Sequence, residues 1–160
     1  VIKEYFSLTC THCASFHINT FPKLKKKLID TGKVKFEFID YPLDRVALFA
    51  ASIARSLPSE SYLETIGLLL SNQMKWAYGK KSIDELLKVS KLFGITETKF
   101  NKILSDKKLM EKILKRMEEE NSKHNISSTP TFIINDKYTI SGSLKYEEFI
   151  KKLKDFKLLN

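Results

Sequence analysis

The two cysteines of this 160-residue chain, Cys10 and Cys13, are separated by two residues in the stretch VIKEYFSLTCTHCASFHINTF. The apolar residues before Cys10 predict a strand, and the pattern after Cys13 predicts an amphipathic helix. A sulfur at such a junction lies beside the unpaired amides and the positive dipole end of the helix, which favour thiolate over thiol. A disulfide that closes so small a ring removes little entropy from the unfolded chain. We therefore expect the pair to be chemically active.

Two other interpretations of the pair are weaker. A structural zinc site needs four ligands, and neither a second Cys pair nor a His-x-x-x-His motif follows. His12 and His17 lie about 140° apart around a helix, so they do not converge on a metal. Two unrelated buried cysteines are the other alternative, which the surrounding strand and helix make rarer. We predict a redox pair without a metal or another cofactor.

The segment EYFSLTCTHCASFH resembles the active-site segment of the DsbA-like branch of the thioredoxin superfamily. Members of this branch carry an acidic residue six positions before the first cysteine, an aromatic strand, and often a histidine just before the second cysteine. Here these positions are Glu4, Tyr5-Phe6 and His12. The chain departs from the family at its start: a strand normally precedes the one with the acidic residue, whereas Val1 begins inside that strand.

A second motif strengthens the resemblance, which spans nearly the whole chain. The stretch SSTPTFIIN at 127–135 is similar to the cis-proline loop that faces the cysteines in this superfamily. The resemblance implies a cis peptide bond before Pro130. Such a bond would expose the backbone of Thr129, with which a bound peptide would pair as an added strand. A trans proline that starts a strand is the alternative. The resemblance also assigns Thr11 to the substrate-binding surface.

The first part of the chain predicts a βαβ unit. Residues 1–8 and 33–39 are expected to form strands, and residues 13–30 the helix between them, kinked near Pro22. A right-handed crossover makes the two strands parallel and places the cysteines at the carboxyl end of the first one.

The last part of the chain predicts a hairpin and a helix. Residues 131–134 and 138–141 are expected to be strands, followed by a helix at about 145–157. The two halves together predict an α/β, thioredoxin-like fold with a mixed sheet of at least four strands, formed by 1–42 and 128–160, with a fifth strand missing.

Residues 43–127 are expected to form an inserted helical subdomain of four or five helices, packed over the active-site end. Ser61 with Glu64, and Ser82 with Glu85, have the spacing of capping boxes. An independent helical domain is the alternative.

The charge of the chain does not suggest a nucleic-acid partner. The formal charge is +9, from 28 basic and 19 acidic residues, but the lysine runs are interleaved with apolar residues at helical spacing. No binding motif or aromatic platform accompanies them. No run of 18 apolar residues could span a bilayer, and no signal peptide is visible.

Roles for the site residues follow from position and resemblance. Cys10, at the start of the helix, is expected to be the exposed nucleophile, and Cys13 the resolving thiol. His12 is expected to stabilise the Cys10 thiolate, and Thr9 and Thr11 to donate hydrogen bonds to it. 

Glu4 is expected in the core beneath Cys13, where the resemblance implies a proton acceptor, and Lys35 is a candidate partner for it. A surface glutamate on an edge strand is the alternative for Glu4.

The resemblance implies a protein thiol-disulfide oxidoreductase that transfers a Cys10–Cys13 disulfide through a mixed disulfide on Cys10. Its substrates would be unfolded or partly folded proteins with cysteines, and a membrane-bound redox partner would reoxidise it in the bacterial periplasm or another extracytoplasmic space. A disulfide isomerase or reductase of the same fold, oligomerising through an N-terminal extension missing before Val1, is one alternative. A non-catalytic peptide-binding chaperone module is the other.

Overall fold

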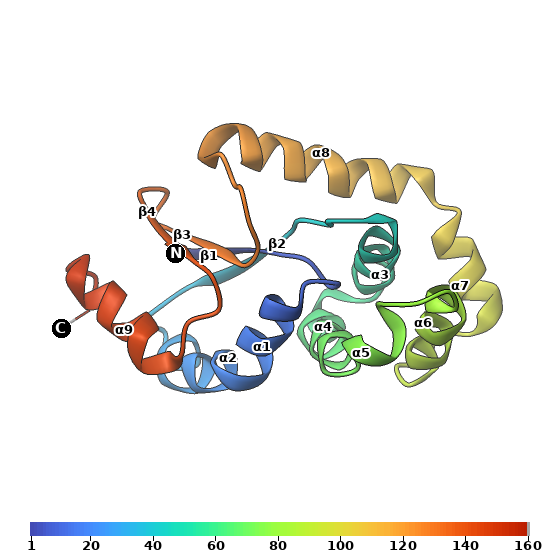
Figure 1. The fold of residues 1–160 in the computed structure, drawn as a ribbon, viewed down its shortest axis with the longest axis horizontal. Coiled ribbons are helices and arrows are strands. Elements are labelled where there is room, and N and C mark those ends of the chain that lie inside the picture. Colours follow the sequence, from blue (N-terminus) through green and yellow to red (C-terminus); the bar gives the residue numbers. More distant parts are fainter. Residues whose placement is uncertain (160) are drawn as a thin grey trace.

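A computed structural model describes residues 1–159 and contains one mixed sheet with the strand order β2-β1-β3-β4 (Figure 1). The strands are β1 (Ile2–Phe6), β2 (Phe36–Asp40), β3 (Thr131–Ile134) and β4 (Tyr138–Ser141). β1 runs parallel to β2 and antiparallel to β3, and β3 runs antiparallel to β4. The predicted βαβ and ββα halves of a thioredoxin-like α/β fold are confirmed.

The expected single helix after β1 is three consecutive pieces. These are α1 (Thr11–Asn19), α2 (Phe21–Leu24) and the π-helical segment η1 (Lys25–Ile29). α1 ends at Thr20, whose hydroxyl donates to Leu144 O at 2.7 Å. Pro22 lies in the first turn of α2, where its missing N–H breaks no intrahelical hydrogen bond. Pro22 thus begins a new helix and does not kink a continuous one.

The insertion between β2 and β3 contains more helices than expected. It comprises α3 (Arg45–Ser56), the 3₁₀ turn η2 (Ser59–Ser61), α4 (Tyr62–Ser71), α5 (Gln73–Trp76), α6 (Ser82–Lys91), α7 (Glu97–Leu104) and α8 (Lys107–His124). The four-residue α5 is too short to show helical periodicity in the sequence. In Figure 1, α3–α7 gather beyond the carboxyl end of β1, and α8 returns along one face of the sheet.

Both predicted capping boxes are wrong. Ser61 precedes α4 but its side chain accepts no amide hydrogen bond, because the chain enters α4 from the 3₁₀ turn and is already helical there. Ser82 is the first residue of α6, and its hydroxyl donates to Gly79 O at 2.8 Å. Thr96 does cap α7, accepting the amide of Lys99.

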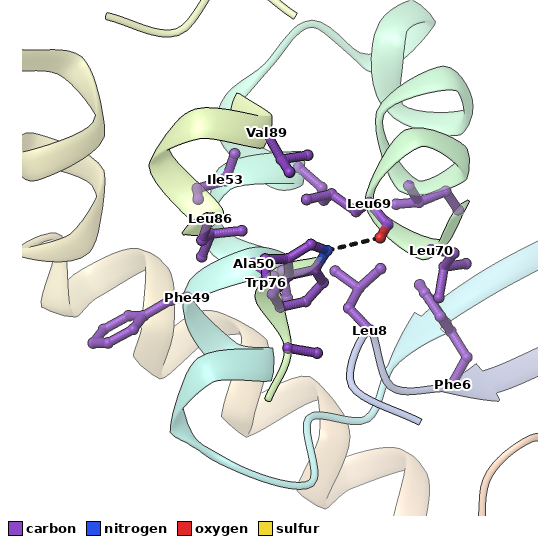
Figure 2. Close-up of a cluster of buried hydrophobic side chains, with 14 of the residues drawn as sticks. Phe6, Leu8, Phe49, Ala50, Ile53, Leu69, Leu70, Trp76, Leu86 and Val89 are labelled. Carbon is purple, nitrogen blue, oxygen red and sulfur yellow. Dashed lines mark hydrogen bonds between the residues drawn. The ribbon is translucent and has the colours of Figure 1, made fainter. Parts of the chain in front are cut away.

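One buried apolar cluster joins the insertion to the strand-to-helix junction (Figure 2). From the junction it includes Phe6, Leu8, Cys10, Cys13 and Ala14, and from the insertion it includes residues of α3–α8. A second cluster lies between the sheet and α1, α2 and the last helix, α9 (Tyr146–Asp155). Across residues 1–159, every helix falls short of the length and apolar character that crossing a bilayer requires.

Candidate active site

Cys10 occupies the N-cap position of α1. A four-residue turn, Ser7–Cys10, links the end of β1 to this helix, and the Cys10 amide donates to Ser7 O at 3.1 Å. The Cys10 backbone is extended, with φ −83° and ψ 119°, so that its sulfur accepts the amide of Cys13 at 3.4 Å. The sulfur therefore takes the place of the oxygen that usually caps a helix.

The expectation of an exposed nucleophile needs correction. Cys10 is only 8% exposed and Cys13 is fully buried. The cause is the apolar cluster above, which places the helical insertion against the junction. Cys10 remains the more accessible of the two sulfurs, which is the order that the assigned roles require.

The two sulfurs differ strongly in acidity. A hydrogen bond from the Cys13 thiol is the largest influence on Cys10, and together with Thr129 and the backbone amides of Cys13 and His12 it lowers the pKa of Cys10 to about 5 against the opposing effect of burial. Burial raises the pKa of Cys13 far above its ordinary range, and the negative charge of Glu4 raises it further. At neutral pH the pair therefore consists of a Cys10 thiolate and a Cys13 thiol.

The loop before β3 faces Cys10. The Thr129–Pro130 peptide bond is cis, and Cys10 Sγ lies 3.4 Å from Thr129 O, to which it donates only when it is protonated. Residues that are 119 positions apart in the chain thus meet at the sulfur. Pro130 is buried and Thr129 is half-buried.

Glu4 lies in the core, and its partner was not predicted. Its Oε2 is 3.1 Å from His17 Nε2, and both side chains are buried. Lys35, the predicted candidate partner, instead pairs with Glu37 at 2.8 Å, because alternation along the strand turns it to the opposite side. The available signal was spacing: His17 follows Cys13 by four residues and so shares its face of α1.

The other polar neighbours of Cys10 act differently from expectation. The side chains of His12 and Thr11 are exposed, and the backbone amide of His12 helps to lower the pKa of Cys10. The Thr9 hydroxyl donates to Asp44 Oδ2 at 2.7 Å and not to the sulfur. Asp44 in turn caps α3, so Thr9 links the active-site turn to the insertion.

The arrangement can carry out thiol-disulfide exchange. A thiolate at the helix start can attack a disulfide or leave from one, and a buried thiol beside it can close a Cys10–Cys13 bond. Within the described residues, 1–159, no group of three or more His, Cys, Asp or Glu side chains could hold a metal ion.

Comparisons with known proteins agree with this chemistry. The family model described as Thioredoxin matches residues 1–155. The crystal structure of Wolbachia pipientis alpha-DsbA1 superposes with a TM-score of 0.86 at 32% identity, covering 96% of this chain and 83% of that one. DsbA of Buchnera aphidicola, a thiol:disulfide interchange protein, is 31% identical over 157 residues, which are 94% of this chain and 71% of that protein.

A protein of Rickettsia typhi named for protein-disulfide oxidoreductase activity is 32% identical over 145 residues. This match covers 90% of the present chain but 54% of the rickettsial protein, so the chain spans about half the length of that relative. The range matched by the family model includes Cys10, Cys13 and the Thr129–Pro130 loop. The chain belongs to the thioredoxin superfamily, in its DsbA-like branch of thiol-disulfide oxidoreductases.

Proposed function

We propose that this protein transfers a Cys10–Cys13 disulfide to unfolded or partly folded proteins that carry cysteines. The observation that supports this most strongly is the asymmetry of the pair, in which an acidified Cys10 caps α1 while Cys13 is fully buried. A chaperone module that only binds peptides would need neither the acidic sulfur nor its buried partner.

The proposed reaction proceeds in two exchanges. A substrate thiolate attacks Cys10 Sγ, the Cys10–Cys13 bond breaks, and Cys13 leaves and takes up a proton. A second substrate thiolate then attacks the substrate sulfur of the mixed disulfide, and Cys10 leaves as a thiolate. The substrate gains a disulfide, and both cysteines of the protein end reduced.

The oxidising direction is favoured by the acidity of Cys10. A stabilised thiolate lowers the free energy of the reduced protein and makes Cys10 a good leaving group, so the disulfide form is a strong oxidant. An isomerase or reductase would need a reducing partner to hold the pair reduced, and nothing in this site favours that role.

Several neighbours have proposed roles in this reaction. Glu4, buried like Cys13, is proposed as the proton acceptor and donor for that sulfur, supported by the effect of its charge on the Cys13 pKa. Thr129, Pro130 and Thr11 are proposed to bind the substrate backbone beside Cys10, supported by the contact between the sulfur and Thr129 O. His12 is proposed to stabilise the thiolate by charge.

The reaction also requires a place and a partner. A disulfide donor of this kind operates in an oxidising compartment, so we propose an extracytoplasmic location in a bacterium, with a membrane-bound redox partner that restores the disulfide. We propose no nucleic-acid partner.

The deciding experiment equilibrates the protein in defined glutathione buffers and measures the redox state of Cys10 and Cys13 beside the oxidation of a reduced, unfolded substrate. We expect an oxidising potential and stoichiometric disulfide transfer, abolished in Cys10→Ser. The Cys13→Ser variant serves as the matched control: it has no disulfide of its own to transfer, but its Cys10 thiolate should attack the glutathione disulfide of the buffer, release one glutathione thiolate, and accumulate as the mixed disulfide between Cys10 and glutathione. Full transfer by Cys10→Ser would refute the proposal.

A further inference from the structure

The turn that carries Cys10 has too few backbone donors for its own carbonyl groups. The Cys10 amide donates to Ser7 O, and the Ala14 amide donates to Cys10 O, both at 3.1 Å. Among residues 1–159, no backbone amide donates to Leu8 O or Thr9 O. Buried carbonyls without a donor are costly, so these two need partners from elsewhere in the chain.

The helical insertion supplies these partners. Gln73 Nε2 donates to Leu8 O at 2.8 Å and to Cys10 O at 3.0 Å, and the Tyr78 hydroxyl donates to Thr9 O at 2.6 Å. Three consecutive carbonyls of the active-site turn are therefore bound by two side chains that lie more than 60 residues away in the sequence. Gln73 is 2% exposed, so no solvent competes for its amide.

Gln73 is held in place by the packing of α5. Trp76, fully buried in the same short helix, donates its indole N–H to Leu69 O at 2.8 Å (Figure 2). Trp76 and Leu8 belong to the same apolar cluster, so α5 and the active-site turn share one packed interior. A four-residue helix has little stability of its own, and this packing is what fixes Gln73.

We propose that Gln73 and Tyr78 are positioning residues that hold the Leu8–Cys10 turn in the one conformation where the Cys10 sulfur faces the amide of Cys13. Without them, Leu8 O and Thr9 O would be left without donors, and the turn would rotate toward other partners. The sulfur would then move away from the amides that stabilise its thiolate. The inference rests on the proposed function, since it assigns these residues to the reaction at Cys10.

Neither residue acts through its own charge. Gln73 does not ionise, and burial, together with the negative charges of Cys10 and Asp44, raises the pKa of Tyr78, so its hydroxyl stays protonated as a donor. Any effect of these residues on Cys10 must therefore come from hydrogen bonding and geometry.

The test measures the titration of the Cys10 thiolate by its ultraviolet absorbance in reduced Gln73→Met and Tyr78→Phe proteins. We expect the Cys10 pKa to rise by about one unit in Gln73→Met, which loses two hydrogen bonds to the turn, and by less in Tyr78→Phe, which loses one hydrogen bond to the turn. The equilibrium with glutathione should shift toward the protein disulfide by about tenfold in Gln73→Met, because a tenfold change accompanies each pKa unit.

Ser90→Ala is the matched control within the insertion. It removes a buried hydrogen bond, from Ser90 Oγ to Leu86 O at 2.7 Å, but touches none of the three carbonyls, so it should lower the melting temperature and leave the Cys10 titration unchanged. If Gln73→Met fails to fold, Tyr78→Phe decides alone, since it deletes one oxygen from a side chain that is 46% exposed.

The proposal is overturned if folded Gln73→Met and Tyr78→Phe titrate like the natural protein, or if Ser90→Ala shifts the Cys10 pKa equally. The titration needs no substrate. If the natural protein transferred no disulfide to a substrate, the proposed function would be refuted, but the titrations would still show whether Gln73 and Tyr78 position Cys10.

Discussion

Glu4 Oε2 lies 3.1 Å from His17 Nε2 in an apolar interior, with Phe21 stacked on the imidazole ring at 5.0 Å between centroids. Glu4 Oε1 has no hydrogen-bond partner among the described residues. A carboxyl group and an imidazole that are both removed from water depend on each other for polar contact. The charge of Glu4 also raises the pKa of Cys13, which shares a helix face with His17, so the pair acts on the buried thiol.

The first prediction concerns Glu4. Glu4→Gln keeps a polar contact with His17 but cannot exchange a proton with Cys13, so oxidation of a reduced peptide should slow by about 100-fold. Stopped-flow fluorescence or quenched thiol labelling measures this rate. Glu37→Gln, which removes a partly exposed carboxylate on β2, is the matched control and should leave the rate unchanged. Equal rates for Glu4→Gln and the natural protein would contradict the assignment.

The second prediction concerns His17. His17→Phe leaves Glu4 buried without its hydrogen-bond partner, so the free energy of unfolding should fall by about 2 kcal/mol in urea titrations. The double variant Glu4→Gln/His17→Phe should show less than the sum of the two single losses, because the residues are in contact. Asn19→Ala, on the exposed side of the same helix, is the control. Strict additivity would show that the pair is not coupled.

The third prediction concerns His12. Because its side chain is exposed, an effect on the Cys10 thiolate can act only through solvent-screened charge. His12→Ser should raise the Cys10 pKa by less than about one unit at low salt, and the difference should shrink at high salt. Thiolate absorbance titrations at two ionic strengths measure it. A salt-independent shift would point to a direct contact instead.

The fourth prediction concerns stability and pH. The pKa of Cys10 falls from an ordinary 9.0 to about 5 on folding. A depressed folded pKa adds stability that is fully present above the unfolded pKa and is lost as pH falls toward 5. The raised pKa of Cys13 lowers the stability of the folded protein only at a pH above the pKa of the unfolded thiol. The buried Cys13 therefore does not change the stability at neutral pH.

Only the reduced protein has this contribution, and the small disulfide ring stabilises the oxidised form little. The reduced form should therefore melt at least about 5 °C higher than the oxidised form at pH 7, and the gap should narrow at pH 4. Matched calorimetric scans measure both. Cys10→Ser should lose the pH dependence between these values. An oxidised form that melts higher at pH 7 would contradict the proposed oxidising role.

Local signals predicted the hairpin well. The strands β3 and β4 begin and end where the sequence pattern placed them, since Asn135 and Asp136 both adopt the left-handed conformation, with φ near 52° and 53°, that such residues tolerate in turns. The predicted start of β2, at Lys33, is three residues too early. The turn after η1 continues through Gly32, and the alternation of apolar and polar residues begins at Val34, before the first residue that pairs with β1.

In the candidate site, too, features set by neighbouring residues were predictable from the sequence, and features set by distant residues were not. Cys10 and Cys13 were recognisable because the chemistry of the pair depends on adjacent residues and a helix end. Gln73 and Tyr78 were not, since their contacts join positions more than 60 residues apart and depend on how the insertion packs. Burial of Cys10 was missed for the same reason: its accessibility is decided by distant helices, whereas its acidity is decided locally.

Because Cys10 is only 8% exposed, it can react only with cysteines that lie on mobile segments of another protein. An attacking sulfur must reach Cys10 through the small part of this residue that is not covered. A cysteine within a packed domain cannot approach Cys10, because the residues around it would clash with this protein. A cysteine on a flexible segment can approach Cys10 without such clashes. Under the proposed function, the disulfide is therefore transferred only while the recipient cysteine is still free to move, and completion of folding in the recipient ends the exchange.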